Sequence, residues 1–278
     1  MVSWLLRRIF QAMLVLLAMT MLVFIGVNVI GNPVDIMISP DATQEVRQRA
    51  IEALGFDQPL WRQYLTFLGN ALRGDIGNSY VFNQPAFEII LQRLPATLEL
   101  ALAALVLSVV IGIPLGLFAG LKPQNPLSRI IMATSILGFS LPAFWVGLML
   151  IMVFSVMLGW LPSIGRGQTV EILGTHWSFL TWDGLKHMLL PALNLSFYKI
   201  SMVLRLTRAG VGETLHTDYI KFARAKGLSP TRIVGVHVLK NIMIPVVTVI
   251  GLGFGGTIAF AVVTETVFAW PGMGKLII

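Results

Sequence analysis

The 278-residue chain contains no cysteine and little charge, and these two deficits exclude several classes of protein. Without a thiol, the chain can form neither a disulfide framework nor a thiolate metal site. Only 12% of the residues are charged, whereas 56% are hydrophobic, which is far from the composition of an ordinary soluble domain. The sequence therefore predicts an all-α integral membrane protein, a polytopic bundle of helices.

Motifs for catalysis are absent as well. No two of the four histidines, His176, His187, His216 and His237, have the helical i, i+4 spacing of a metal-binding pair. The segment WPGMGKL is the nearest approach to a phosphate-binding loop, but Ala269 replaces its first glycine and Leu276 its final Ser or Thr. We therefore expect no enzyme, no catalytic residue, no metal site and no cofactor in this chain.

Five apolar windows have about the 20 residues that a helix needs to cross a bilayer. They cover residues 9–30, 97–120, 130–161, 188–204 and 242–263. A cleaved signal peptide is the alternative for the first window, but no small-residue cleavage site follows it. Residues 276–278 are apolar again, so we expect a sixth span to begin there, with a short interfacial tail as the alternative.

The distribution of basic residues predicts the orientation, because short loops rich in Lys and Arg stay in the cytoplasm. Residues 205–240 carry seven basic side chains against two acids, and loop 121–129 carries two basic side chains and no acid. Residues 32–95 carry five basic and seven acidic side chains, and residues 161–187 two of each. We therefore expect a cytoplasmic N-terminus, and this placement explains the net charge of +7 without a nucleic-acid partner.

Three regions follow from this topology: an N-terminal transmembrane helix (1–31), an external helical segment (32–95) and a transmembrane core (96–278). In the external segment, Asp41 and Gln44 predict a capping box and Gly55 the end of a short helix. Pro59 predicts the start of a second helix, which Gly74 ends. These helices either cover the outer mouth of a pathway or pack there without a role in transport.

Glycines recur every four residues in two of the spans, a spacing that lets helix backbones approach closely. They are Gly112, Gly116 and Gly120 in the second span and Gly251 and Gly255 in the fifth. We expect both sets to form seams between packed helices.

A few residues within the spans are candidates for a transport pathway. Pro142 predicts a kink in the third span, with Phe144 and Trp145 beside it. Asn194 and Lys199 lie in the fourth span, where polar groups are costly. We expect Lys199 to snorkel to the cytoplasmic interface, and Asn194 to bond a neighbouring helix. The alternative is that Lys199 faces a cavity and attracts the carboxylate of a solute.

Two glutamates, Glu99 and Glu265, lie at the predicted outer ends of spans. Water reaches such positions, so a charge there is inexpensive. We therefore expect both carboxylates to be solvated.

The basic segment DYIKFARAKGLSPTRIVGVHVLKN, residues 218–241, lies between two apolar spans. It predicts a helix over 219–226 that ends at Gly227, and a second helix that Ser229 caps, that Pro230 starts and that runs to about Lys240. Such an ordered loop is more than a connector. The segment has two interpretations: a surface helix pair that binds anionic lipid, or a docking site for a soluble partner.

Several stretches in this order resemble the permeases of binding-protein-dependent ABC importers, in the dipeptide and oligopeptide group that includes nickel and glutathione permeases. They are GFDQPLWRQYL (55–65), RGDIGNSY (73–80), RLPATLELALAALVLSVVIGIPLGLFAG (93–120), LGWLPSIG (158–165), YIKFARAKGLSPTRIVGVHVLKNIMIPVVT (219–248) and VVTETVFAWPGMGKL (262–276). The general family form has Glu-Ala-Ala six residues before the glycine. Here Lys221, Phe222 and Ala223 occupy these places, and only Ala223 and Gly227 match.

The resemblance implies the permease subunit of a peptide importer in a bacterial inner membrane, with nickel or glutathione as alternative substrates. It implies coupling helices at about 213–240 that bind two separate ATPase subunits, which hold ATP and Mg²⁺. The residues in this role are Tyr219, Lys221, Phe222, Ala223, Arg224, Ala225, Lys226, Gly227, Leu228 and His237. A second permease subunit and an external solute-binding protein are the other implied partners. The alternative from another class is a secondary carrier driven by an ion gradient.

Overall fold

The computed structural model describes residues 2–30, 43–79, 82 and 84–277, and it is almost entirely helical. The chain divides into two compact units, residues 1–91 and 92–278. Four helices of the described chain are long and apolar enough to cross a membrane, or five if a sharply bent pair is counted as one span. The prediction of a polytopic helical membrane protein is therefore confirmed at this level.

The first unit contains α1 (Val2–Ile30), α3 (Gln44–Leu54) and α4 (Leu60–Ala71). The Thr20 hydroxyl lies 3.0 Å from the Tyr64 hydroxyl, and the Phe24 ring packs edge-on to Tyr64, so α4 contacts the second half of α1. Gly55 ends α3 in the left-handed conformation (φ 72°), as predicted. Thr43 precedes α3 without a side-chain cap, and the predicted capping residue Asp41 lies outside the described residues.

The helix α5 (Ala86–Leu121) begins before the predicted span and holds Pro95 and Pro114 in its interior. It is followed by α6 (Pro126–Ser140), which the Asn125 side chain caps. The chain then breaks at Leu141 and Pro142, and α7 (Ala143–Leu150) continues into the π-helix η1 (Ile151–Met157). The bend between the two helices is 117°. The predicted kink at Pro142 is thus confirmed and is sharp enough to separate two helices.

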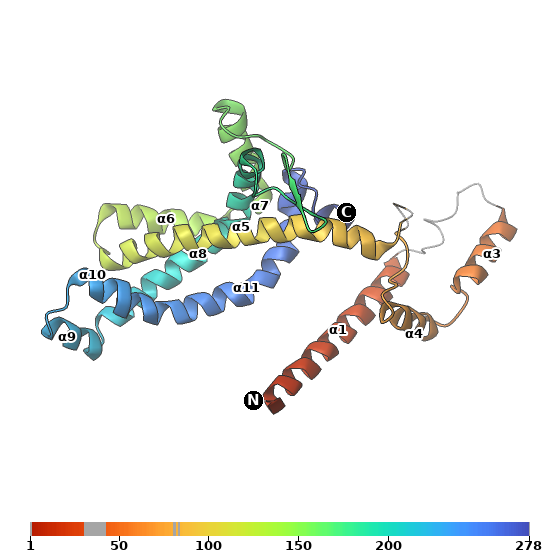
Figure 1. The fold of residues 1–278 in the computed structure, drawn as a ribbon, viewed down its shortest axis with the longest axis horizontal. Helices are drawn as coiled ribbons and strands as arrows, with labels where there is room; N and C mark the ends of the chain where they lie inside the picture. Colours follow the sequence, from red (N-terminus) through yellow and green to blue (C-terminus); the bar gives the residue numbers. More distant parts are fainter. Residues whose placement is uncertain (1, 31–42, 80–81, 83, 278) are drawn as a thin grey trace. The chain divides into compact units, whose positions relative to one another are not determined.

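A two-stranded antiparallel hairpin, β1 (Val170–Ile172) and β2 (Thr175–Trp177), precedes α8 (Trp182–Leu215). This hairpin was not predicted. The helix α8 begins six residues before the expected span because the Thr181 hydroxyl accepts a hydrogen bond from the Gly184 N–H at 2.9 Å. It packs against α6, α7 and α11 and is the central helix of the second unit (Figure 1).

The chain ends with α9 (Asp218–Ala225), α10 (Pro230–Arg232), the π-helix η2 (Ile233–Val238), α11 (Leu239–Val267) and α12 (Gly274–Ile277). The prediction that the second basic helix stops near Lys240 is wrong. From Pro230 to Val267 the helix is continuous over 38 residues. Polar side chains such as Lys240 and Asn241 do not end a helix, and the helix also continues through Pro245, as membrane helices can when the freed backbone group finds another partner.

One of the two predicted glycine seams is present. A Cβ on Gly112 would lie 2.9 Å from Val203, one on Gly116 2.6 Å from the Leu204 carbonyl, and one on Gly120 2.6 Å from Val211. These glycines therefore hold α5 and α8 in backbone contact. No atom of the described chain lies within 4 Å of a Cβ at Gly251 or Gly255. The second seam is thus unpartnered within this chain, because α8 packs on a different face of α11.

Candidate functional site

Residues 218–232, here called the elbow, form a sharp helical turn that glycine and serine shape. Gly227 has a φ of +74°, a conformation that residues with a Cβ adopt only at a cost. The Ser229 hydroxyl then accepts from the Arg232 N–H, and Pro230 occupies the first turn of α10. Both predicted features of the turn are confirmed.

The inner face of the elbow is part of the hydrophobic core of the second unit. Its buried residues and their neighbours are Val211, Ile220, Ala223, Ile233, Val238 and Ile242, with Leu117, Leu215 and Leu228 packed around them. They come from α8, α9, η2 and α11, with Leu117 from α5 and Leu228 from the turn between α9 and α10. The elbow therefore cannot shift without moving the ends of the long helices to which it is packed.

The outer face carries most of the residues that the resemblance assigns to coupling. Tyr219, Lys221, Phe222, Arg224, Ala225, Lys226 and Gly227 are exposed. The Phe222 side chain is 61% exposed, and the Lys226 ammonium lies 4.5 Å from the centre of its ring. Leu228 and His237 are half-buried, and the His237 carbonyl accepts from the Tyr219 hydroxyl at 3.4 Å. Ala223 is buried inside the chain, so its side chain offers no contact to a partner.

A cavity of about 760 Å³ lies between α6, α7, α8 and α11. Most of its lining is apolar or aromatic, including Phe139, Tyr198 and Phe260, but Asn194 and Lys199 also line it. The Lys199 ammonium donates to the Gly253 carbonyl at 2.7 Å. The structure therefore places Lys199 at the cavity, which was the alternative to snorkelling.

Phe144 and Trp145, the other candidate pathway residues, are not brought to this cavity. Both lie on α7 and are about half exposed, while their neighbours Ala143 and Val146 line the cavity. Asn194 also bonds a neighbouring helix as expected, because its Nδ2 donates to the Thr264 hydroxyl of α11 at 3.0 Å.

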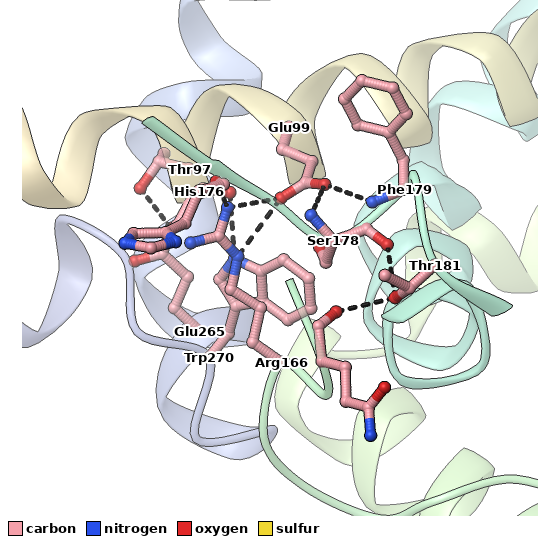
Figure 2. A network of polar contacts seen from close by, with 11 residues as sticks. Thr97, Glu99, Arg166, His176, Ser178, Phe179, Thr181, Glu265 and Trp270 are labelled. Atoms are coloured by element: carbon pink, nitrogen blue, oxygen red, sulfur yellow. Dashed lines mark hydrogen bonds and ion pairs between the residues drawn. The ribbon is translucent and has the colours of Figure 1, made fainter. Parts of the chain in front are cut away.

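At the opposite end of the second unit from the elbow, Glu99 is almost completely buried. Figure 2 shows the polar groups that surround its carboxylate. Its Oε2 accepts from both Nη2 and Nε of Arg166, at 2.7 and 3.2 Å. Its Oε1 accepts from the N–H groups of Ser178 and Phe179, each at 2.7 Å. Arg166 also donates to the His176 carbonyl. One carboxylate of α5 thus joins the loop before the hairpin to the segment after it.

Glu265, near the end of α11, is fully buried beside this network. It accepts from the Thr97 hydroxyl and from the Gly274 N–H, both at 2.5 Å. The Trp270 indole N–H donates to the Ala96 carbonyl at 2.9 Å. Residues 268–276 are therefore folded back against α5 at Ala96 and Thr97.

The prediction that water reaches Glu99 and Glu265 is wrong. Burying a carboxylate is costly unless donors surround it. Here the donors come from α5, the loop before the hairpin, the segment after it and the C-terminal segment. The glycines of WPGMGKL were a signal in the sequence that this segment packs closely against another part of the chain. A Cβ on Gly272 or Gly274 would collide with the Glu265 carboxylate.

Comparisons with known proteins agree with this architecture. Residues 112–278 match the family model "Binding-protein-dependent transport system inner membrane component", and residues 1–101 match the model of its N-terminal region. Among solved structures, the inward-facing MetNI methionine ABC transporter superposes with a TM-score of 0.52 at 18% identity, covering 68% of this chain and 78% of that one. At this identity the likeness shows the shared fold alone.

Curated relatives match the whole chain and 86–87% of their own length. The chain is 38% identical to the di/tripeptide transport system permease of Pseudomonas aeruginosa and 39% identical to the oligopeptide transport system permease of Bacillus subtilis. It is 36% identical to the glutathione transport system permease of Escherichia coli. The chain belongs to the family of binding-protein-dependent transport system inner membrane components, the permease subunits of ABC importers.

Proposed function

We propose that this permease moves short peptides across the bacterial inner membrane by alternating access, driven by separate ATPase subunits that bind the elbow. The elbow carries the proposal, because its inner face is fixed to the long helices and its outer face is free to bind a partner. Relatives named for di/tripeptide and oligopeptide transport support peptides as the substrate. Glutathione is the alternative, and it is supported by a relative named for it.

In this proposal the N-terminus and the elbow face the cytoplasm, and the hairpin faces outward. The excess of Lys and Arg in loop 121–129 and in residues 205–240 supports this orientation. Residues 1–31, 32–95 and 96–278 then serve as an anchor helix, an external segment and the transport core, and lipid surrounds the exposed apolar faces. An external binding protein delivers the solute at the hairpin end.

The mechanism requires that the ATPases bind one state of the permease more tightly than the other. ATP binding draws the two ATPases together, and the elbow transmits this displacement to α8 and α11, on which it is packed. The complex needs a second permease. Its packing surface is the face of α11 around Gly251 and Gly255, which no other helix of the described chain covers. ATP and Mg²⁺ belong to the ATPases in this assembly.

Replacing Phe222 with alanine tests the coupling role. The side chain is 61% exposed and contributes little to the core, so we expect normal insertion and assembly but a loss of uptake of about tenfold or more, as for a central aromatic residue of an interface. The measurement is ATP-driven uptake of labelled dipeptide by the reconstituted importer, with ATP hydrolysis recorded in parallel.

Leu127→Ala is the matched control, because Leu127 is a similarly exposed apolar residue in the first turn of α6, on the predicted cytoplasmic side. Normal uptake by the Phe222 variant would contradict docking at the elbow. Gly227 is a less selective target, because a larger residue there also strains the turn.

Uptake of dipeptides, glutathione and nickel by the wild-type complex distinguishes the substrates, and uptake by this chain alone would favour a secondary carrier.

A further inference from the structure

The cavity between α6, α7, α8 and α11 contains a charge that packing does not explain. Its volume of about 760 Å³ is in the range of small-ligand sites. The ammonium of Lys199 lies among mainly apolar residues on a membrane-spanning helix, where a charged group is costly and usually has a function.

The Lys199 ammonium has spare capacity for hydrogen bonds. It donates to one acceptor, the Gly253 carbonyl, and an ammonium has three N–H groups. No carboxylate of the described chain forms an ion pair with it. A Cβ on Gly253 would lie 2.6 Å from Nζ, so the glycine leaves the space that the ammonium occupies. The cation is thus held in place but not neutralised.

Asn194 lines the same cavity but does not present a free group to it. Its side chain is 4% exposed, its Nδ2 donates to Thr264, and its Oδ1 is buried although it has no hydrogen-bond partner. Lys199 is therefore the group through which this cavity can bind a charged solute.

Lys199 and Asn194 are too far apart to hold both ends of one dipeptide. Lys199 bonds the Gly253 carbonyl and Asn194 bonds Thr264, eleven residues further along α11, or about 16 Å at 1.5 Å per residue. Two extended residues of a peptide span only about 7 Å. A short peptide can therefore present its carboxylate to Lys199 while its side chains lie against the apolar wall.

We propose that this cavity is a transit site for a short peptide, in which the Lys199 ammonium binds the C-terminal carboxylate. The proposal rests on the proposed function and deepens it. The surrounding apolar wall accepts varied side chains without hydrogen-bond selection. With only one charged contact the site binds weakly, as a pathway requires if the solute is to leave it.

The test uses the intact importer in nanodiscs of zwitterionic lipid, without the binding protein. Saturation-transfer NMR records binding of dialanine and of dialanine amide. We expect dialanine to bind, and the amide or the variant Lys199→Met to weaken binding about tenfold or more, the effect of a lost charge-assisted hydrogen bond. Lys199→Arg should retain most of the binding because it retains the charge.

Lys186→Met is the control, because Lys186 lies on the same helix outside the cavity, over the Trp182 ring. Co-elution of each variant with its partner subunits checks assembly. Equal binding of the acid and the amide, an unchanged Lys199→Met variant, or no dialanine signal would overturn the proposal. If an anionic lipid binds at Lys199 while dialanine does not, the cavity is a lipid site and the proposal fails.

Uptake separates this proposal from the function on which it rests. If the wild-type complex with its binding protein takes up no peptide, the proposed function fails. If the wild type and Lys199→Met take up dialanine at the same rate, only the transit site fails.

Discussion

Glu99→Ala is expected to destabilise the permease by about 3–5 kcal/mol, the loss found when one partner of a buried ion pair is removed. The substitution leaves the Arg166 guanidinium, whose side chain is 12% exposed, without its carboxylate. It also leaves the N–H groups of Ser178 and Phe179 without their acceptor. The measurement is the thermal midpoint of the purified complex, followed by loss of the intact species.

Glu171→Ala is the control for this prediction. Glu171 lies in the hairpin between Arg166 and Ser178, but it is exposed. We expect a change of no more than about 0.5 kcal/mol for it. Arg166→Met should cost less than Glu99→Ala, since Glu99 then keeps two backbone donors. Equal midpoints for the two glutamate variants would show that the buried network does not hold this end of the protein together.

The second large effect is expected at Gly116. A methyl group there would lie 2.6 Å from the Leu204 carbonyl and from Thr207 Cβ, so α5 and α8 must move apart. Overpacking of this kind costs about 1–3 kcal/mol. In an unhindered helix the same change from glycine to alanine gains about 1 kcal/mol. Gly116→Ala should therefore lower the yield of folded protein and its thermal midpoint.

Gly212→Ala is the matched control, because Gly212 is in the helix α8 and has no atom within 4 Å of a Cβ. Its midpoint should be unchanged or slightly higher. A comparable loss in both variants would show that helix propensity, and not the contact of α5 with α8, determines the effect.

Local signals in the sequence were sufficient for much of the fold. Apolar length located the long apolar helices, Pro142 located the break between α6 and α7, and Gly227 and Ser229 located the turn of the elbow. Each of these features depends on residues a few positions apart, where backbone preferences act directly.

The buried network could not be predicted in the same way. Glu99 bonds Arg166 across 67 positions, and Thr97 bonds Glu265 across 168. A glutamate at the end of a span is solvated unless another segment covers it, and nothing near it in the sequence shows which segment does so. The position of Lys199 likewise depends on how α8 and α11 face each other, which their composition leaves open.

The continuous helix from Pro230 to Val267 joins the elbow to Glu265. At about 1.5 Å per residue its 38 residues extend about 57 Å. Glu265 and Trp270 anchor one end to α5, while the other end carries the surface proposed to meet the ATPase. If the ATPase displaces the elbow as proposed, the anchored end holds still and the displacement reaches the middle of the helix, where Gly253 and the cavity lie.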